Sequence, residues 1–374
     1  MKKLYRFLPA LVFLVFLAVM AGLLLFSPLK EYSENEKRYL AGLPEVTAEK
    51  IMDGTTQKEL EKFTSDQIPG RDLFVGINAY WNLLTGRTGA QDIYYCKDNY
   101  LINAPKPYDE QTYLNNLKNF DNFAAGVGLP ADLIMVPSTG YLMDRVLPIS
   151  HGEYHDDVLY QKAIATLRNI RLIDVRQPLK DGTLRGQVCY RTDHHLTSFG
   201  NYLIYQTYQN AVGAPWVPQD AYTVTSYDGF YGTTWSGSGY QMIPPDKVDL
   251  WDSGAKVTVT LQDGGKEPVV SHSLFFPSHL ENLDKYPVYL DGNHSLVEIS
   301  NPDAGGGSIL VIRDSYAHCL GTFLASSYQK IYMVDLRYYR DSLSEFLKEH
   351  PVDRILYLYG VDNMMTDTNS AWLN

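Results

Sequence analysis

The sequence predicts an α/β fold in which a parallel sheet carries helices on both faces. Short apolar runs bounded by glycine or polar residues indicate buried parallel strands, and Ser308–Cys319 (SILVIRDSYAHC) contains the clearest of them. Apolar residues recur at helical spacing between these runs, so strands and helices alternate along the chain. Two additions complete the predicted architecture: a β-rich insertion at about 215–306 and an N-terminal transmembrane helix.

Residues 1–29 are predicted to form a membrane anchor. A basic N-terminus precedes the uncharged run Phe7–Phe26, which is long enough to span a bilayer. The basic end should stay cytoplasmic, which places the rest of a single-pass protein outside the cytoplasm. Bulky residues follow the small residues of Ala18–Gly22, and this pattern favours an uncleaved anchor over a signal peptide.

Residues 30–90 are expected to form a stalk and an N-terminal helical segment. The clearest element is a helix capped by Asp72 and running to Leu84. Its stripe of Phe74, Ile77, Tyr80 or Trp81, and Leu84 is interpreted as a core-facing surface.

Residues 91–374 are expected to form the α/β domain. Gly126 is the expected end of a helix that begins near Tyr113, and Asp156 the expected N-cap of the next. Beyond these, the predicted elements are a strand at 133–136, a strand at 171–175, a helix from Thr197 or Ser198 to Gly213, a strand ending before Ser315, a helix to Ser327, a strand at 330–336, a helix opened by Ser342 and a strand at 354–359.

Composition excludes some classes of function. The formal net charge is -11 and no basic stripe is present, which argues against a nucleic-acid partner. The three cysteines have no metal-binding spacing and permit one disulfide at most. Cys319 lies close to Ser315 but is interpreted as a small buried apolar residue. We expect no cofactor.

Ser315 is the candidate nucleophile, because it lies just beyond the carboxyl end of a predicted buried strand, where open α/β sheets bind ligands. A serine hydroxyl needs a histidine base held by a third group. In an extended turn, residues i and i+2 share a face, so Asp193 could orient His195 toward the serine. The three residues together predict an acyl-transfer site.

An acyl-transfer site also needs donors to the developing oxyanion. The backbone N–H of Ser315 is one natural donor. Arg337 and Asn363, both at the carboxyl ends of predicted strands, are candidates for a second donor. Tyr316 and His194 are further candidates for oxyanion or substrate contacts.

Two metal-site interpretations compete with the acyl-transfer site. His151 and His155 have a ligand spacing that works only on a helix, and Gly152 argues against a helix there. The letters Asp-His-His also occur in metal-dependent phosphoesterases, but those require further alternating aspartates that this chain lacks. No metal is expected.

Several motifs carry a resemblance to a known family. The segment 190–197 (YRTDHHLT) resembles the signature of the DHHW protein family, and Asp314–His318 with 334–339 resembles its carboxyl-terminal half. The resemblance also extends to residues 33–38, 66–71 and Phe230–Thr233. Leu196 stands where the family has tryptophan, so this position offers no aromatic ring for stacking. The family is similar to the SGNH-like domains of alginate O-acetyltransferases, so the resemblance implies a flavodoxin-like SGNH fold.

The resemblance assigns Ser315 as nucleophile, His195 as base and Asp193 as orienting acid. It implies O-acetylation of an exported or cell-surface polysaccharide, with acetyl supplied by a membrane-bound O-acyltransferase partner. Two alternatives stay open: a carbohydrate acetylesterase using the same residues, and a catalytically silent polysaccharide-binding or assembly protein.

Overall fold

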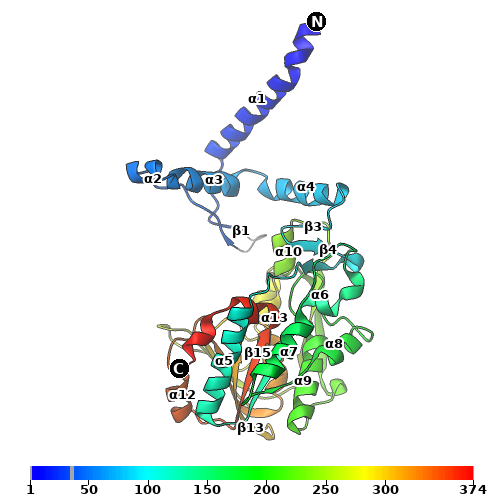
Figure 1. Cartoon of the computed structure of the whole chain (residues 1–374), viewed down its shortest axis with the longest axis vertical. Coiled ribbons are helices and arrows are strands. Elements are labelled where there is room, and N and C mark those ends of the chain that lie inside the picture. The colour runs from blue at the N-terminus through cyan, green and yellow to red at the C-terminus, as the bar shows by residue number, and fades with distance from the viewer. Residues whose placement is uncertain (1, 34–37, 374) are drawn as a thin grey trace. The chain divides into compact units, whose positions relative to one another are not determined.

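The computed structural model describes residues 2–33 and 38–373 (Figure 1). Residues 34–37, part of one motif noted above, lie outside the described residues. The chain forms two compact units, which are described separately: residues 1–91 with 235–242, and residues 92–234 with 243–374.

The first unit is helical. Its helices are α1 (Lys2–Phe26), α2 (Ala48–Met52), α3 (Thr55–Gln67) and α4 (Arg71–Leu84). Its strands are β1 (Tyr32–Ser33), β2 (Arg38–Tyr39) and β3 (Gly89–Ala90). The stretch Phe7–Phe26 of α1 is long and apolar enough to cross a membrane. Membrane anchors and signal sequences share this property.

Two expectations for α4 are wrong. The N-cap is Gly70, whose φ of 74° suits glycine, and Asp72 lies in the first turn. The predicted core stripe is exposed: the exposed fractions are 40% for Phe74, 56% for Ile77, 61% for Trp81 and 81% for Leu84. Gly76 and Ala79 are buried instead.

The second unit contains the predicted sheet and the helices on its faces. Its helices are α5 (Glu110–Val127), α6 (Thr139–Leu142), α7 (Asp156–Thr166), α8 (Arg176–Gly182), α9 (Ser198–Val212), α11 (Ala317–Leu324), α12 (Leu343–Glu349) and α13 (Val361–Thr366); α10 (Thr233–Ser238) begins in it. Its strands are β4 (Ile93–Tyr95), β5 (Leu101–Asn103), β6 (Ala131–Val136), β7 (Arg171–Leu172), β8 (Thr223–Phe230), β9 (Asp246–Asp252), β10 (Thr258–Gln262), β11 (Val269–Ser271), β12 (Leu296–Ser300), β13 (Gly306–Arg313), β14 (Tyr328–Asp335) and β15 (Arg354–Gly360).

The main sheet has the strand order β11-β10-β12-β14-β13-β15-β6-β7. The five strands from β14 to β7 are parallel, which confirms the predicted mixed fold with a mostly parallel sheet. The predicted insertion is β-rich, and its strands β10, β11 and β12 extend this same sheet in antiparallel pairing. Its other strands, β8 and β9, form a separate two-stranded ribbon.

Strand β13 supplies both cores of the unit, because successive side chains of a strand point to opposite faces. Ile309 and Val311 pack in the core with α8, α9 and α11. Leu310 and Ile312 pack in the core with α5, α7 and α13. From β13 the chain passes through α11 to β14 on one side, and α12 then leads to β15 on the other side. The carboxyl end of β13 is therefore a topological switch point, the usual ligand position in such sheets.

Some predicted boundaries shift. Helix α5 ends at Gly128 rather than Gly126, because Gly128 adopts the left-handed conformation (φ 71°) that closes the helix. Asp156 is the first residue of α7 and not its N-cap; its carboxylate accepts hydrogen bonds from the backbone N–H and hydroxyl of Ser138. By contrast, Thr197 caps α9 and Ser342 caps α12 as predicted.

Candidate active site

The turn after β13 presents Ser315. Arg313 and Asp314 are 1% exposed, and Ser315 is the first residue after them with partial access to solvent. The buried Asp314 carboxylate holds the turn by accepting hydrogen bonds from the N–H groups of Tyr316 and Gly360 (2.9 and 2.8 Å) and from the side-chain amide of Asn363 (2.7 Å). Burial raises the pKa of Asp314, although these donors oppose the shift.

The structure brings Ser315, His195 and Asp193 together from segments 120 residues apart. The His195 Nε2 atom lies 2.9 Å from the Ser315 hydroxyl oxygen, and Nδ1 lies 2.5 Å from Asp193 Oδ1. An ionised carboxylate can only accept, so Nδ1 carries the proton that binds Asp193. Nε2 is then the nitrogen that can accept the serine proton.

Asp193 is 1% exposed, and its carboxylate is fully hydrogen-bonded. Oδ1 accepts from the backbone N–H and Nδ1 of His195; Oδ2 accepts from the backbone N–H (2.6 Å) and hydroxyl (2.9 Å) of Thr233. Burial alone would raise the pKa of Asp193, but the His195 and His194 imidazoles and these donors bring it well below the usual range. The carboxylate is therefore held ionised.

The loop that carries Asp193 is tied to the insertion through Asp246, the first residue of β9. Its carboxylate, 1% exposed, accepts hydrogen bonds from the backbone N–H groups of Arg191 and Thr192 and from their side chains. Gly232, in the insertion, packs directly on the candidate acid: a Cβ atom placed there would lie 2.1 Å from the Asp193 Cβ. The insertion therefore shapes this site.

Tyr286 contacts both the candidate base and the segment that carries the candidate nucleophile. Its ring stacks on the His195 imidazole, with centroids 3.8 Å apart and planes at 9°. Its hydroxyl donates to the backbone carbonyl of Ser315 at 3.2 Å. No sequence pattern indicates Tyr286, because it lies in the weakly periodic insertion. Gly232 and Thr233 belong to the Phe230–Thr233 motif, but the motif does not indicate their contacts with Asp193.

The four residues proposed as oxyanion or substrate contacts have different surroundings. Arg337 is held by the Asp335 carboxylate (2.9 and 2.6 Å) and by Asn293, and Asn363 donates to Asp314 as described. Tyr316 donates from its hydroxyl to the His194 carbonyl at 3.0 Å, and its ring meets the His195 ring edge-on. His194 lies against His195 and its Nδ1 is 2.7 Å from the Thr233 hydroxyl.

The backbone N–H of Ser315 has no hydrogen-bond partner within residues 2–33 and 38–373, so it is available to a ligand. An oxyanion formed by attack of the serine hydroxyl would develop beside this group.

Asp193, His194 and His195 also form a group whose ligand atoms lie within 4.8 Å of one another, as a metal site requires. Both Asp193 oxygens and both His195 nitrogens are already hydrogen-bonded to protein groups. A metal would have to displace these partners, so the donor set does not fit a preformed metal site.

The three cysteines are buried and unpaired. Burial raises the pKa of the Cys319 thiol to about 12, so it is not a competing thiolate nucleophile.

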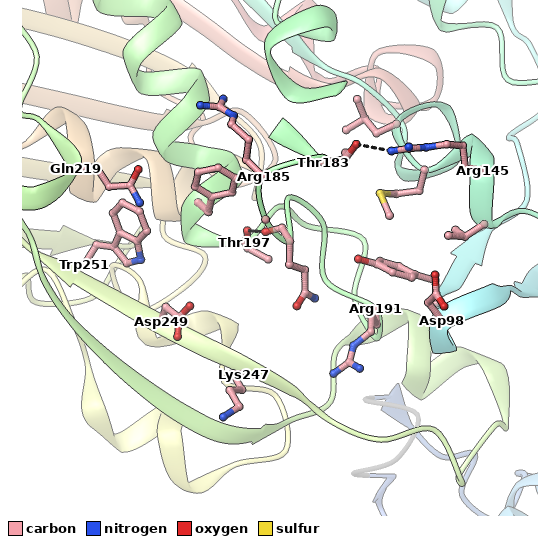
Figure 2. A pocket seen from close by; sticks show the side chains of 17 residues that line it. Asp98, Arg145, Thr183, Arg185, Arg191, Thr197, Gln219, Lys247, Asp249 and Trp251 are labelled. Carbon is pink, nitrogen blue, oxygen red and sulfur yellow. Dashed lines mark hydrogen bonds between the residues drawn. The ribbon is translucent and has the colours of Figure 1, made fainter. Parts of the chain in front are cut away.

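A separate hollow has a volume of about 930 Å³ (Figure 2). Arg191 and Thr197, which flank the Asp193–His195 segment in the chain, contribute to its wall. In Figure 2, Trp251 and Gln219 lie at one end and Arg145 and Asp98 at the other. Tyr100, Phe199 and Trp251 supply aromatic surface.

Comparisons with known proteins agree with the fold. A DHHW family protein from Eubacterium siraeum, solved by crystallography, has 18% identity and a TM-score of 0.66, covering 76% of this chain and 95% of that one. Bacillus cereus PatB1 with a sulfonyl adduct has 18% identity and a TM-score of 0.63, covering 75% and 98%. No curated protein matches the sequence. The family model described as DHHW protein matches residues 168–334, and the resemblance of this chain to the DHHW family is thereby confirmed.

Proposed function

We propose that this protein is an O-acyltransferase that acetylates a cell-surface or exported polysaccharide outside the cytoplasm. The observation that carries the proposal is the hydrogen-bonded series Asp193–His195–Ser315, with its buried ionised acid and partly exposed serine. The resemblance of the motifs to the DHHW and alginate O-acetyltransferase families supports acetyl as the group transferred.

In the proposed reaction, the Ser315 hydroxyl attacks the carbonyl carbon of an acetyl donor while His195 Nε2 takes the hydroxyl proton. The developing oxyanion is stabilised by the Ser315 backbone N–H. When the carbon–donor bond breaks, the leaving group takes the proton from His195, and acetyl-Ser315 remains. Asp193 holds the imidazole in the required tautomer and stabilises its positive charge.

A sugar hydroxyl then attacks acetyl-Ser315 and gives its proton to His195. The bond to the serine oxygen breaks, the serine recovers the proton and the O-acetylated sugar leaves. Water in place of the sugar would make the enzyme an esterase. The identity of the acceptor therefore distinguishes the transferase from its nearest alternative.

The hollow of Figure 2 is the proposed place for the sugar units that flank the reacting one, because Ser315 and His195 are not among its lining residues. Its aromatic walls offer surfaces for sugar rings, and side chains such as Gln219 and Asp249 offer hydrogen-bonding groups to hydroxyls. Helix α1 supports a location at the membrane, where an acetyl-delivering membrane partner would be within reach.

The test uses the purified full-length protein in detergent with a chromogenic acetyl ester. Wild-type protein should release acetate, and Ser315→Ala should lose about 10³-fold or more of the rate. A sulfonyl fluoride should modify Ser315, as mapped by mass spectrometry, and His195→Ala should lose that adduct. Adding oligosaccharides should then divert acetyl to sugar in the wild-type protein.

Two results would overturn the proposal. A folded protein that neither releases acetate nor forms the adduct would have no activated serine. If wild-type protein without this activity still bound oligosaccharides, and Ser315→Ala bound them equally tightly, the polysaccharide-binding alternative would replace the enzyme.

A further inference from the structure

Helix α4 presents large apolar side chains to solvent along one face. Leu73, Ile77, Trp81 and Leu84 follow one another at spacings of four, four and three residues, which places them on one side of a helix. Their exposed fractions are 63%, 56%, 61% and 81%, and Phe74 beside them is 40% exposed. These five residues are called the α4 stripe below.

The α4 stripe is not the face that fixes the helix in its unit. Residues 235–242 of the same unit pack on the small residues Gly76 and Ala79, where a Cβ on Gly76 would lie 3.4 Å from the Gly239 carbonyl oxygen. Tyr80 adds an edge-on contact with Tyr240 (5.4 Å) and accepts a hydrogen bond from the N–H of Met242 (3.1 Å). The stripe is therefore a second apolar surface, separate from the packed one.

We propose that the α4 stripe lies in the interfacial layer of the lipid bilayer that α1 crosses. A helix with aromatic and aliphatic side chains on one face binds a membrane surface by burying that face among headgroups and the first acyl carbons. Trp81 has the amphipathic ring that is enriched at this depth. Large exposed apolar patches otherwise mark sites that another surface covers.

The position of α4 in the chain favours lipid as the occupant. It lies in the same compact unit as α1, whose apolar residues Phe7–Phe26 are unburied. Exposed apolar side chains continue through the segment between the two helices: Leu43, Val46, Ile51, Met52 and Leu60. A protein partner would be expected to cover one compact patch, whereas a bilayer can receive side chains spread along a tethered segment.

The test compares two single cysteines on the full-length chain, Ile77→Cys on the stripe and Asn82→Cys on the flank away from it, about 140° from Ile77 around the helix. The native cysteines are buried, so an environment-sensitive fluorophore reports the introduced position. The labelled proteins are reconstituted in vesicles of phosphatidylcholine and phosphatidylglycerol, with and without lipids carrying an acyl-chain quencher.

We expect the label at position 77 to be blue-shifted, and to be quenched by the lipid quencher several-fold more than the label at position 82. This difference should be the same at all protein densities. Equal quenching at the two positions would overturn the proposal. Shielding of position 77 that grows with protein density would identify a second copy as the occupant. Shielding without lipid quenching would identify another protein surface, including the second unit of the same chain.

Discussion

The Tyr286 ring lies flat against the imidazole of His195, with centroids 3.8 Å apart, while its hydroxyl binds the carbonyl of Ser315. One side chain thus contacts the candidate base on its face and the backbone of the candidate nucleophile at its end. The contact fixes the plane in which His195 can exchange a proton with the serine.

Replacing Tyr286 should therefore lower the rate of the chemical step more than substrate binding. Tyr286→Leu removes the stacking surface, and we expect kcat to fall about 10- to 100-fold with little change in KM. Tyr286→Phe keeps the ring and should lose much less. The control is Tyr357→Phe, which removes a buried hydroxyl-to-carbonyl hydrogen bond of the same length (3.2 Å, to Phe120) away from the site. A similar kcat for Tyr286→Leu and Tyr357→Phe would refute the role.

Gly232 should be essential because Asp193 occupies the space that a side chain would need. The Cβ of Gly232→Ala would lie 2.1 Å from the Asp193 Cβ and 2.3 Å from Oδ2, so the carboxylate must move away from His195. We expect acetyl-ester hydrolysis to fall by about 100-fold. Gly305→Ala is the matched control, because nothing lies within 4 Å of its Cβ position. Retained activity in Gly232→Ala would show that the close packing of Gly232 on Asp193 is not required.

Asp362 should make stability depend on pH. Burial and the neighbouring Asp156 raise the pKa of Asp362 to about 6, against an ordinary value of about 3.9. Between these values the unfolded chain loses the proton while the folded protein keeps it. This contribution to stability is therefore complete below about pH 4 and is lost as the pH rises through about 6.

Asp362→Asn should consequently be neutral at pH 4 and more stable than wild type at pH 8, by about 1 to 3 kcal/mol, since the side chain is partly solvated. Urea unfolding at the two pH values measures this difference. Asp341→Asn, at an exposed position, reports the effect of removing one negative charge alone. If the two variants behave alike at both pH values, Asp362 does not titrate as described.

The three cysteines of the native protein should not react with alkylating reagents. All three are buried, and burial raises the pKa of Cys96, Cys189 and Cys319 to about 12 in each case. Iodoacetamide at pH 8 should therefore label none of them in the native protein and all of them in urea, as read by mass spectrometry. If Cys319 were labelled in the native protein and ester hydrolysis were lost, the Cys319 thiol would again be a candidate nucleophile.

The sequence was informative where local pattern determines structure. Strand β13 and the turn to Ser315 follow from a four-residue apolar run that ends in polar residues. The Asp193–His195 contact was predicted from an extended turn, but the segment is bent, and the His195 backbone N–H donates to Asp193 Oδ1. Tyr286, Gly232 and Thr233 could not be found in this way. Each reaches the site from the insertion, across sequence separations that no periodicity reports.

The exposed stripe of α4 shows a different limit. Helical spacing correctly indicated an apolar face around Ile77 and Trp81, but spacing does not say what covers that face. The small residues Gly76 and Ala79, which look unremarkable in the sequence, make the actual packing surface because they let residues 235–242 approach closely.

The insertion has a consequence for protein engineering. A β-rich segment inserted between two elements of an α/β sheet would be an obvious segment to exchange in order to change which glycan the proposed enzyme recognises. Here Thr233, Asp246 and Tyr286 all belong to that segment and hold Asp193, its loop and His195 in place. Swapping residues 215–306 for another sequence would thus disrupt the geometry of the candidate active site along with any glycan recognition that the insertion provides, so the two cannot be redesigned independently.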